Sequence, residues 1–302
     1  MSEIDVVWLI DLDPPSDVGG GKGFYPASSR TDPPDETLMR KRCDAALELV
    51  TSLAGGKAVV TVHTSPRHRT ALLEGIYPEI WSQFLASGAA LALHPHEERE
   101  DRSTLYDDPA HMADVITRTI ALGRARGITF ETFRSGTFSF NPALPRILAD
   151  AGIHIDLSAA PTLRDPHRSI DWPAKSAEPD VFRRDGIDVV EIPIGWDGSG
   201  SSVDENYLFS ERMDLKGLIR VWDALRARAA TAGAPLLVNY LCHGFGLVDP
   251  AWRRQASDFI AHIGSHGGRL VGADAARRRL EQKPPRGNGH DDSGDRTRVV
   301  LR

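Results

Sequence analysis

The sequence predicts an α/β protein built as a single-domain (β/α) barrel, and three observations carry this prediction. Strand-like apolar runs alternate with amphipathic, helix-like runs along nearly the whole chain. The turns between them are short and contain glycine, which is typical of βαβ units in a parallel sheet. Seven or eight such units in succession fit a barrel better than a doubly wound sheet in two domains. A nucleotide-binding fold has little support, because no Gly-x-Gly-x-x-Gly follows a strand and no P-loop is present.

The predicted elements follow the hydrophobic periodicity. Strands are expected at residues 6–13, 58–62, 89–94, 128–134, 153–157, 189–194 and 236–243, with a last short strand at 270–271. Helices are expected at residues 35–54, 69–87, 108–126, 142–151, 214–232 and 250–263. Gly88, Gly127 and Gly152 follow three of these helices, as is typical of helix C-termini.

Two segments lie outside this pattern. Residues 14–34 are rich in Gly, Pro and Ser and form either a mobile surface loop or a lid over a substrate. The composition of residues 283–302 cannot support a core, so we expect a disordered tail after one domain of residues 1–282.

Bulk properties narrow the class of protein. The net charge of -6 and pI near 6.0 argue against a nucleic-acid partner, which normally needs a basic face. No apolar run approaches the roughly 20 residues of a membrane helix, and the N-terminus lacks a signal-peptide pattern. We therefore expect a cytoplasmic protein without a membrane partner. Cys43 and Cys242 are too few for a disulfide scaffold and are expected to be packed; the oligomeric state is not predicted.

Reactive side chains gather where predicted strands end. These residues are Asp11, Asp13, His94, His96, Glu98, Arg134 and His243. In parallel α/β folds, ligands and catalytic groups collect at the carboxyl ends of the strands. A metal-dependent hydrolase is therefore the first hypothesis.

Asp11 and Asp13 stand two residues apart, a spacing that places both carboxylates on one face of a strand. Close carboxylates acquire different pKa values, so one can bind a metal while the other moves protons. The alternative is a turn-forming or capping role before Pro14 and Pro15.

His94, His96 and Glu98 offer ligand types that suit Zn²⁺. If Pro95 starts a helical turn, His94 and Glu98 approach each other. If the segment stays extended, His94 and His96 share a face. The residues leave both arrangements open.

Arg134 and His243 end two further strands. An arginine in this position commonly fixes a carboxylate or a substrate anion, and a histidine in a glycine-rich turn can act as general acid or base. Asp156 or Asp171 could tune that histidine, or could serve as turn or cap residues.

Other histidines and tryptophans have weaker contexts. His63 and His68 follow the second strand and could line the mouth of the barrel. Trp172 and Trp196 lie in loops after strands, where they could stack on a sugar ring or pack under a loop.

The order of these motifs resembles the polysaccharide deacetylase family, carbohydrate esterase family 4. The matching segments are Asp11-Leu-Asp13, Gly88 to His94, Phe133-Arg134-Ser135-Gly136, Gly152 to Ser158, Glu191-Ile-Pro193 and Leu241-Cys-His243. The resemblance covers residues 6 to about 275 and implies a distorted (β/α) barrel with about seven strands. The family usually has His-x-x-x-His in its second motif, whereas position 98 of this chain is Glu. Either His96 or Glu98 therefore replaces the second histidine, or metal binding is altered.

The resemblance also implies roles for these residues. Asp13, His94 and His96 (or Glu98) would hold a divalent metal, expected to be zinc. Asp11 would act as general base, oriented by Arg134, and His243 would protonate the leaving amine. A backbone N–H near Ser135 would help to stabilise the oxyanion. The residues expected to bind substrate are Ser135, Asp156, Trp172, Trp196 and Leu241.

The function expected from this resemblance is N-deacetylation of a cytoplasmic amino sugar or glycosylated metabolite. Three alternatives remain open. The protein could hydrolyse a non-sugar amide, imide or ureide, with or without a metal. It could bind carbohydrate without catalysis, on a barrel that has lost its metal. It could also be a sugar isomerase built from the same ligand types.

Overall fold

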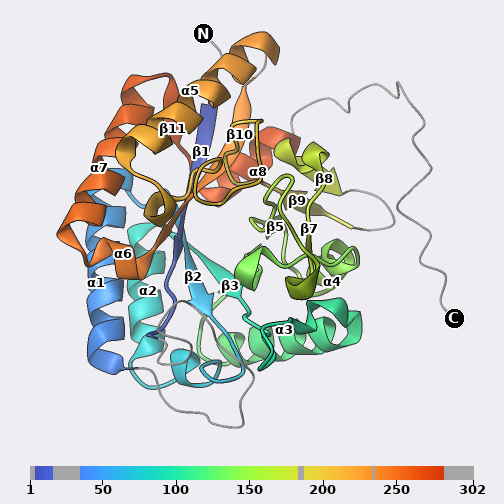
Figure 1. The fold of residues 1–302 in the computed structure, drawn as a ribbon. Helices are drawn as coiled ribbons and strands as arrows, with labels where there is room; N and C mark the ends of the chain where they lie inside the picture. Colours follow the sequence, from blue (N-terminus) through green and yellow to red (C-terminus); the bar gives the residue numbers. More distant parts are fainter. Residues whose placement is uncertain (1–3, 16–34, 183–186, 233–234, 282–302) are drawn as a thin grey trace, which may run out of the picture.

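A curled, mostly parallel β-sheet organises the molecule in the computed structural model, which describes residues 4–15, 35–182, 187–232 and 235–281 (Figure 1). The parallel strands are β1 (Ile4–Asp11), β2 (Ala58–His63), β3 (Ala90–His94), β4 (Thr132–Phe133), β5 (Ile155–Asp156), β9 (Val189–Glu191) and β10 (Leu236–His243). Their order across the sheet is β10-β1-β2-β3-β4-β5-β9. β8 (Asp180–Phe182) continues the sheet antiparallel to β9, and β11 (Gly268–Leu270) pairs with β1.

The two sides of the curled sheet meet through isolated bridges instead of a continuous ladder. Ile194, just beyond β9, bridges to Asn239 of β10, and Phe209 bridges to Leu241. The described residues therefore form a distorted barrel, which confirms the predicted fold class. A short antiparallel pair, β6 (Arg164–Asp165) and β7 (Ile170–Asp171), lies outside the sheet.

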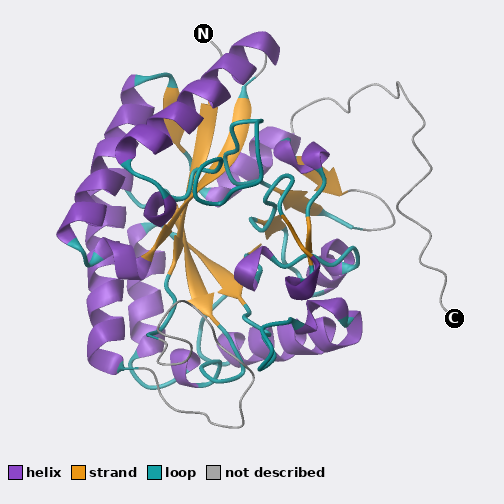
Figure 2. Ribbon diagram, viewed as in Figure 1, coloured by secondary structure: helices purple, strands orange, loops and turns teal. Residues whose placement is uncertain are grey.

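Helices surround the outer face of the sheet (Figure 2). They are α1 (Glu36–Ala54), α2 (Tyr77–Ser87), α3 (Pro109–Arg124), α4 (Leu144–Asp150), α5 (Leu215–Ala232) and α7 (Pro250–Ser265). The prediction of a helix from residue 69 was wrong at its start. A 3₁₀ turn at Ala71–Leu73 and the left-handed backbone of Gly75, with φ of 59°, precede α2 and prevent a continuous helix.

Two short helices were not predicted. α6 (Gly244–Leu247) follows β10 directly, and α8 (Ala273–Glu281) packs Ala273, Ala276 and Leu280 against the inward-facing residues of the sheet. α8 therefore covers the interior of the barrel near the start of β1. Arg279 of α8 and Arg269 of β11 both pair there with the buried carboxylate of Asp5.

Alternation along the strands divides the core into an outer and an inner layer. In β1, Val6 and Trp8 pack toward the helices, whereas Val7 and Leu9 face the interior. Because side chains alternate along a strand, Asp11 falls on the same inward face as Val7 and Leu9. The alternation thus places the Asp11 carboxylate in the interior of the barrel, at the end of the apolar run of β1.

Both cysteines are buried, as expected. Burial raises the pKa of each thiol to about 12, and the indole N–H of Trp8 points to the Cys242 sulfur at 3.3 Å. A thiolate nucleophile is therefore disfavoured at either position. Residues 16–34 of the glycine-rich loop and the expected tail at 283–302 lie outside the described residues. Every described helix is too short or too polar to traverse a lipid bilayer.

Candidate active site

Strand register places the reactive residues at one end of the barrel, which we call the carboxyl mouth. Asp11 of β1 pairs in register with His243 of β10, and His63 of β2 pairs with His94 of β3. Because neighbouring parallel strands end at the same edge of the sheet, four side chains distant in sequence reach the carboxyl mouth. The sequence-predicted residues Asp11, His94 and His243 are among these four. His63 is added to them by the register with His94.

A buried carboxylate and three imidazoles form the centre of the mouth. Asp13, His63, His94 and His96 each offer a ligand atom, and these atoms all lie within 4.8 Å of one another. We call these four residues the Asp13 cluster. Asp13 Oδ1 lies 3.0 Å from His63 Nδ1, 3.5 Å from His94 Nε2 and 3.9 Å from His96 Nε2. Burial raises the pKa of Asp13, but its histidine partners outweigh burial and leave that pKa well below the usual range.

The hydrogen bonds of His94 and His96 orient their Nε2 atoms toward each other. His94 Nδ1 lies 2.8 Å from the backbone carbonyl of Arg134, and His96 Nδ1 lies 2.9 Å from Glu98 Oε1. Because both partners are acceptors, each Nδ1 carries a proton, and a ring in its neutral form presents a lone pair at Nε2. The two Nε2 atoms are only 3.0 Å apart, so either a proton or a metal ion must lie between their lone pairs. Burial lowers the pKa of His96, but the charge and hydrogen bond of Glu98, with Asp13 and Asp11, outweigh burial and raise it.

The donor set therefore fits a divalent transition metal. Imidazole nitrogen and carboxylate oxygen are preferred ligands of zinc and its neighbours. Burial lowers the pKa of His63 well below its usual range, so this ring is neutral, which is the form that ligates metals.

The segment from His94 to Glu98 is extended, which resolves the alternative that the sequence left open. His94 and His96 share a face, and Glu98 lies behind His96 as its hydrogen-bond acceptor instead of joining the Asp13 cluster. The Pro95 carbonyl accepts hydrogen bonds from the Tyr106 hydroxyl at 2.8 Å and from the Gly136 N–H at 3.0 Å. These contacts hold the segment against β4.

Asp11 lies beside the Asp13 cluster and is positioned by Arg134. Asp11 Oδ2 is 3.6 Å from Arg134 Nε, 3.8 Å from His94 Nε2 and 3.9 Å from His243 Nε2. Asp11 Oδ1 is buried and has no hydrogen-bond partner among the described residues. The guanidinium of Arg134 lies over the Phe138 ring at 4.0 Å, which fixes its plane. The free oxygen of Asp11 is therefore placed to accept a proton from a bound molecule.

His243 lies across the mouth from Arg134 and is held by Glu211. Glu211 Oε1 accepts the backbone N–H of His243 at 2.8 Å, and Glu211 Oε2 lies 3.3 Å from His243 Nδ1. Burial lowers the pKa of His243, but the hydrogen bond and charge of Glu211, with Asp11 and Asp13, outweigh burial and raise it. The Nε2 side of this ring, which faces the two aspartates, is suited to donate a proton.

Glu211 was not predicted from the sequence. Asp156 and Asp171, considered either as partners of His243 or as turn or cap residues, have other partners in the structure. Asp156 accepts the backbone N–H of Ser158 at 2.9 Å and also the Ser158 hydroxyl, and burial raises its pKa to about 6. Asp171 is exposed and pairs with Arg164 at 2.9 Å. Glu211 lies in the short turn Ser210–Arg212, where the local sequence resembles an ordinary polar surface turn.

The backbone N–H groups of Ser135 and Gly136, where an oxyanion donor was expected, are both engaged in hydrogen bonds within the protein. The Ser135 N–H is donated to the Ser158 hydroxyl at 2.8 Å, and the Gly136 N–H is donated to the Pro95 carbonyl. These amides hold neighbouring loops together, so they cannot also serve a substrate oxygen without breaking those bonds. Asp156 contributes to the site through this Ser158–Ser135 connection.

The expected substrate-binding side chains Trp172 and Leu241 are packed in the core. Trp172 is 1% exposed and donates its indole N–H to the Phe138 carbonyl at 2.8 Å, and Leu241 is 1% exposed within β10. Trp196 is half-buried and donates to the Gly200 carbonyl. For both tryptophans the packing alternative therefore describes the structure better than an exposed stacking surface.

Phenylalanines surround the proton-transfer groups instead. Phe209 stacks on the His243 ring at 5.2 Å, and Phe245 lies 5.0 Å from the same ring on an exposed position. Phe138 lies between Arg134 and the rings around His243: its ring contacts the Arg134 guanidinium, and its centroid is 6.3 Å from that of Phe209. This aromatic wall gives the mouth an apolar flank.

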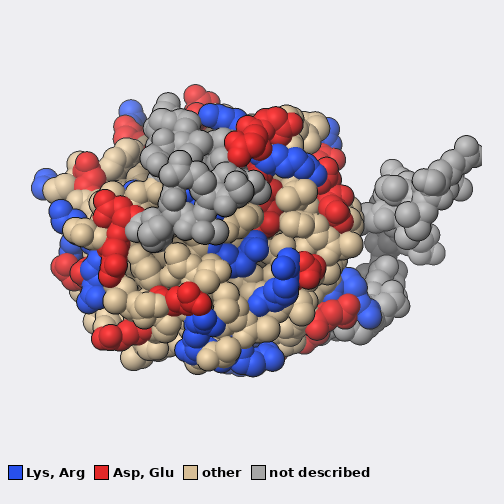
Figure 3. All heavy atoms as spheres, turned by 90° about the horizontal axis from the view of Figure 1, so that it is seen from below, with Lys and Arg blue, Asp and Glu red and all other residues tan. Residues whose placement is uncertain are grey.

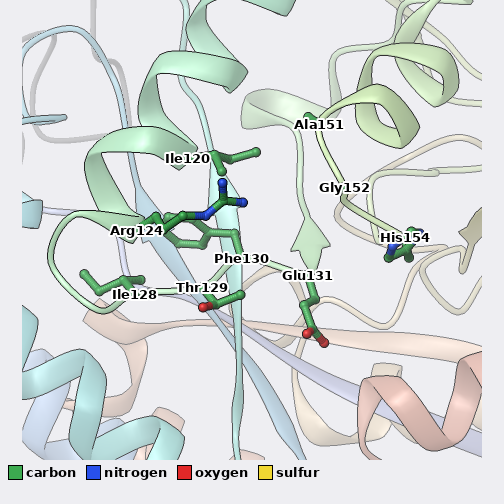
Figure 4. Close-up of a pocket in the computed structure, with 9 residues that line it drawn as sticks. All are labelled: Ile120, Arg124, Ile128, Thr129, Phe130, Glu131, Ala151, Gly152 and His154. Carbon is green, nitrogen blue, oxygen red and sulfur yellow. The ribbon is translucent and has the colours of Figure 1, made fainter.

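A cavity of about 140 Å³ lies away from these residues (Figure 4). Its lining includes Phe130 and Glu131, which precede β4, and Gly152 and His154, which precede β5. It is therefore at the amino ends of the strands, opposite the carboxyl mouth where barrel enzymes bind their substrates.

Comparisons with known proteins agree with the fold. No protein-family model matches the sequence. No curated protein sequence matches it significantly. Among solved structures, a Mycobacterium smegmatis protein assigned as a polysaccharide deacetylase has a TM-score of 0.61 at 16% identity, covering 94% of this chain and 93% of that one. Puue allantoinase has a TM-score of 0.62 at 14% identity, with 94% and 92% covered.

A Pseudomonas aeruginosa PAO1 protein, also assigned as a polysaccharide deacetylase, has a TM-score of 0.61 at 14% identity, with 94% and 93% covered. The resemblance of this chain to that family is therefore confirmed at the level of fold.

Proposed function

We propose that the protein hydrolyses a carbon–nitrogen bond of an amide-type small molecule, with a divalent metal held by Asp13, His94 and His96. One observation carries this proposal. Two buried histidines direct Nε2 atoms at each other across 3.0 Å beside a carboxylate, with Asp11 and His243 next to them. A metal centre with a base and an acid at its edge is the arrangement that hydrolysis of an unreactive amide requires.

The chain's own residues divide the proton transfers between them. A bound metal would supply electrophilic activation of the amide carbonyl and of water. Asp11 takes a proton at its unpartnered Oδ1, while Arg134 lies beside the other oxygen and orients the carboxylate. His243 donates a proton from Nε2 to the departing nitrogen, and Glu211 at Nδ1 keeps the ring oriented and protonated.

The substrate proposed first is an N-acetylated amino sugar or glycosylated metabolite in the cytoplasm. Hydrolysis of its N-acetyl group releases acetate. The motif order and the fold support this choice. A second candidate is a non-sugar amide, imide or ureide, because Phe138, Phe209 and Phe245 form the flank of the mouth and the tryptophans are packed away. An aromatic, apolar flank accommodates a planar ring as readily as a sugar face.

A purely binding role has less support. A carbohydrate-binding barrel needs neither an arginine-positioned carboxylate nor a histidine paired with a buried glutamate. We also propose that nucleic acid is not a partner: on the face seen in Figure 3, basic and acidic side chains are interspersed.

The test is an assay of purified protein loaded with zinc, cobalt or manganese. It measures acetate release from N-acetylated mono- and oligosaccharides in parallel with ring opening of hydantoin-type imides and ureides. Asp11→Asn and His243→Gln should reduce turnover by at least about 100-fold, the lower range for removing a general acid or base. Turnover that persists unchanged in both variants would contradict the assigned roles.

A further inference from the structure

We infer that His63 is a fourth protein ligand of the metal, and that Glu98 is a positioning residue that orients His96 without ligating. This inference rests on the metal site of the proposed function. It assigns a role to a histidine outside the ligand motif expected from the sequence, and it explains why position 98 can be Glu.

The distances within the Asp13 cluster match a single metal ion with four protein ligands, which keeps a position for water when it expands to five ligands. Ligand atoms around a tetrahedral ion with bonds of about 2.0 Å lie about 3.3 Å apart. His63 Nδ1 is 3.0 Å from Asp13 Oδ1, the His94 and His96 Nε2 atoms are 3.0 Å apart, and Asp13 Oδ1 is 3.5 Å from His94 Nε2. Asp13 Oδ1 and His96 Nε2 are 3.9 Å apart, which exceeds the ideal edge by less than an ångström, and all four ligand atoms lie within 4.8 Å of one another.

The fold fixes His63 in this position. His63 ends β2 in register with His94, and its side chain is fully buried. Its ring stacks on His96 at 4.7 Å with an interplanar angle of 23° and meets His94 edge-on. An imidazole held by a strand and two neighbouring rings reaches the ion without any loop movement, so it is pre-organised as a ligand.

Glu98 orients His96 by accepting a hydrogen bond on the side of the ring that faces away from the Asp13 cluster. Its Oε1 accepts from His96 Nδ1 at 2.9 Å, just as the Arg134 carbonyl accepts from His94 Nδ1 at 2.8 Å. A β-bridge to Thr104 holds the Glu98 backbone. Hydrogen-bond acceptors behind ligating histidines fix the ring and increase its basicity. His96 thus takes the place of a second histidine at position 98, and the carboxylate at 98 orients it.

The alternative for His63 is a hydrogen-bond donor to Asp13 that never contacts the ion. The two roles differ in what they do to the coordination sphere. Loss of a ligand changes both the affinity and the visible absorption of Co²⁺, which reports coordination number and geometry. Loss of an outer hydrogen bond lowers affinity but leaves the spectrum of the bound ion unchanged.

The experiment titrates metal-free protein with Co²⁺ and with Zn²⁺ in competition with a chromophoric chelator. It compares the wild type with His63→Ala, His63→Asn, Glu98→Gln and a control, His111→Ala. His111 pairs with Glu97 and lies outside the Asp13 cluster. Circular dichroism of each metal-free variant establishes that it is folded. Two His63 substitutions are used so that one still tests the ligand role if the other variant does not fold.

We expect His63→Ala and His63→Asn to weaken metal binding by more than about 100-fold and to change the Co²⁺ spectrum. Glu98→Gln should weaken binding by about 10- to 100-fold and keep the spectrum, and His111→Ala should match the wild type. Folded His63 variants with the wild-type spectrum would overturn the ligand role. Wild-type affinity in Glu98→Gln would overturn the positioning role. A wild type that binds neither metal would instead defeat the proposed function itself.

Discussion

At the scale of single residues, the site depends on glycines that leave room for reactive side chains. A Cβ atom on Gly136 would lie 2.8 Å from His96 Cγ and 2.6 Å from the Pro95 carbonyl oxygen. A Cβ on Gly246 would lie 2.5 Å from Glu211 Oε1. Neither glycine has a left-handed backbone, so it is the close approach that requires glycine at these positions.

The first prediction concerns Gly136. Gly136→Ala should displace His96 from the Asp13 cluster. It should weaken Zn²⁺ binding by about 10-fold or more, the effect typical of losing a residue that orients a metal ligand. Chelator competition measures this affinity. Gly264→Ala in α7 is the control, because its Cβ would meet open space. Equal affinities in the two variants would show that His96 tolerates the displacement.

The second prediction concerns the pH dependence of turnover. Glu211 raises the pKa of His243, and the proposed acid role requires the protonated ring. Activity should therefore be lost as pH rises through that pKa, and Glu211→Gln should move the alkaline limb of kcat/KM to lower pH. The pH–rate profile measures the shift, with exposed Glu205→Gln as control. An alkaline limb that stays in place would assign it to another group.

At the scale of elements, the strands were easier to predict than the short helices. Continuous apolar runs predict both ends of β1, β2, β3 and β10 to within two residues, because buried parallel strands need apolar side chains on both faces. α8 was missed because three consecutive arginines dominate it and only small or single apolar residues reach the interior. Periodicity detects a helix with a broad apolar stripe, and α8 presents a narrow one.

In the candidate site, too, some residues could be predicted from the sequence and others could not. Asp11, Asp13, His94, His96, Arg134 and His243 could be predicted because each ends a recognisable strand or follows one closely. His63 was expected as a possible residue of the mouth, but its place in the Asp13 cluster could not be predicted, because its proximity to His94 depends on the order of strands across the sheet. Glu211 could not either, since a turn distant in sequence brings it to His243. Local patterns predict strand ends, whereas tertiary contacts decide which polar residues meet.

The third prediction concerns α8. Ala276 is fully buried against the interior, so Ala276→Asp should lower the free energy of unfolding by about 3 kcal/mol or more through an unpaired buried charge. Ala275→Asp, one residue away on the exposed side, should change it by less than about 0.5 kcal/mol. Urea denaturation of both variants tests this difference. Similar losses would mean that α8 does not cover the interior.

At the scale of the whole molecule, a similar fold is retained in proteins that share only 14–16% of their residues with this chain. Such low identity is compatible with one fold because packing tolerates many apolar substitutions that keep volume and pattern. The chemistry resides in a few side chains at the carboxyl mouth, so the fold alone does not select the substrate.

The fourth prediction concerns the stability of the whole protein. A metal that binds only the folded state should stabilise it by about 2.7 kcal/mol at a free concentration 100 times Kd. Zn²⁺ should therefore raise the Tm of the metal-free wild type in differential scanning calorimetry, and EDTA should reverse the rise. In His94→Ala the same addition should leave the Tm unchanged. An equal rise in both proteins would indicate metal binding elsewhere.

The position of β1 between β2 and β10 has a consequence for how activity arises during synthesis. β2 ends at His63, whereas β10 begins only at Leu236, so the sheet stays open along this seam until most of the chain exists. All members of the Asp13 cluster precede residue 97 and are synthesised long before His243 can face Asp11. Such long-range pairing is slow relative to local contacts. If the protein binds a metal as proposed, all four ligands would be in place before β10 closes the sheet, whereas the proposed acid His243 would reach Asp11 only on closure.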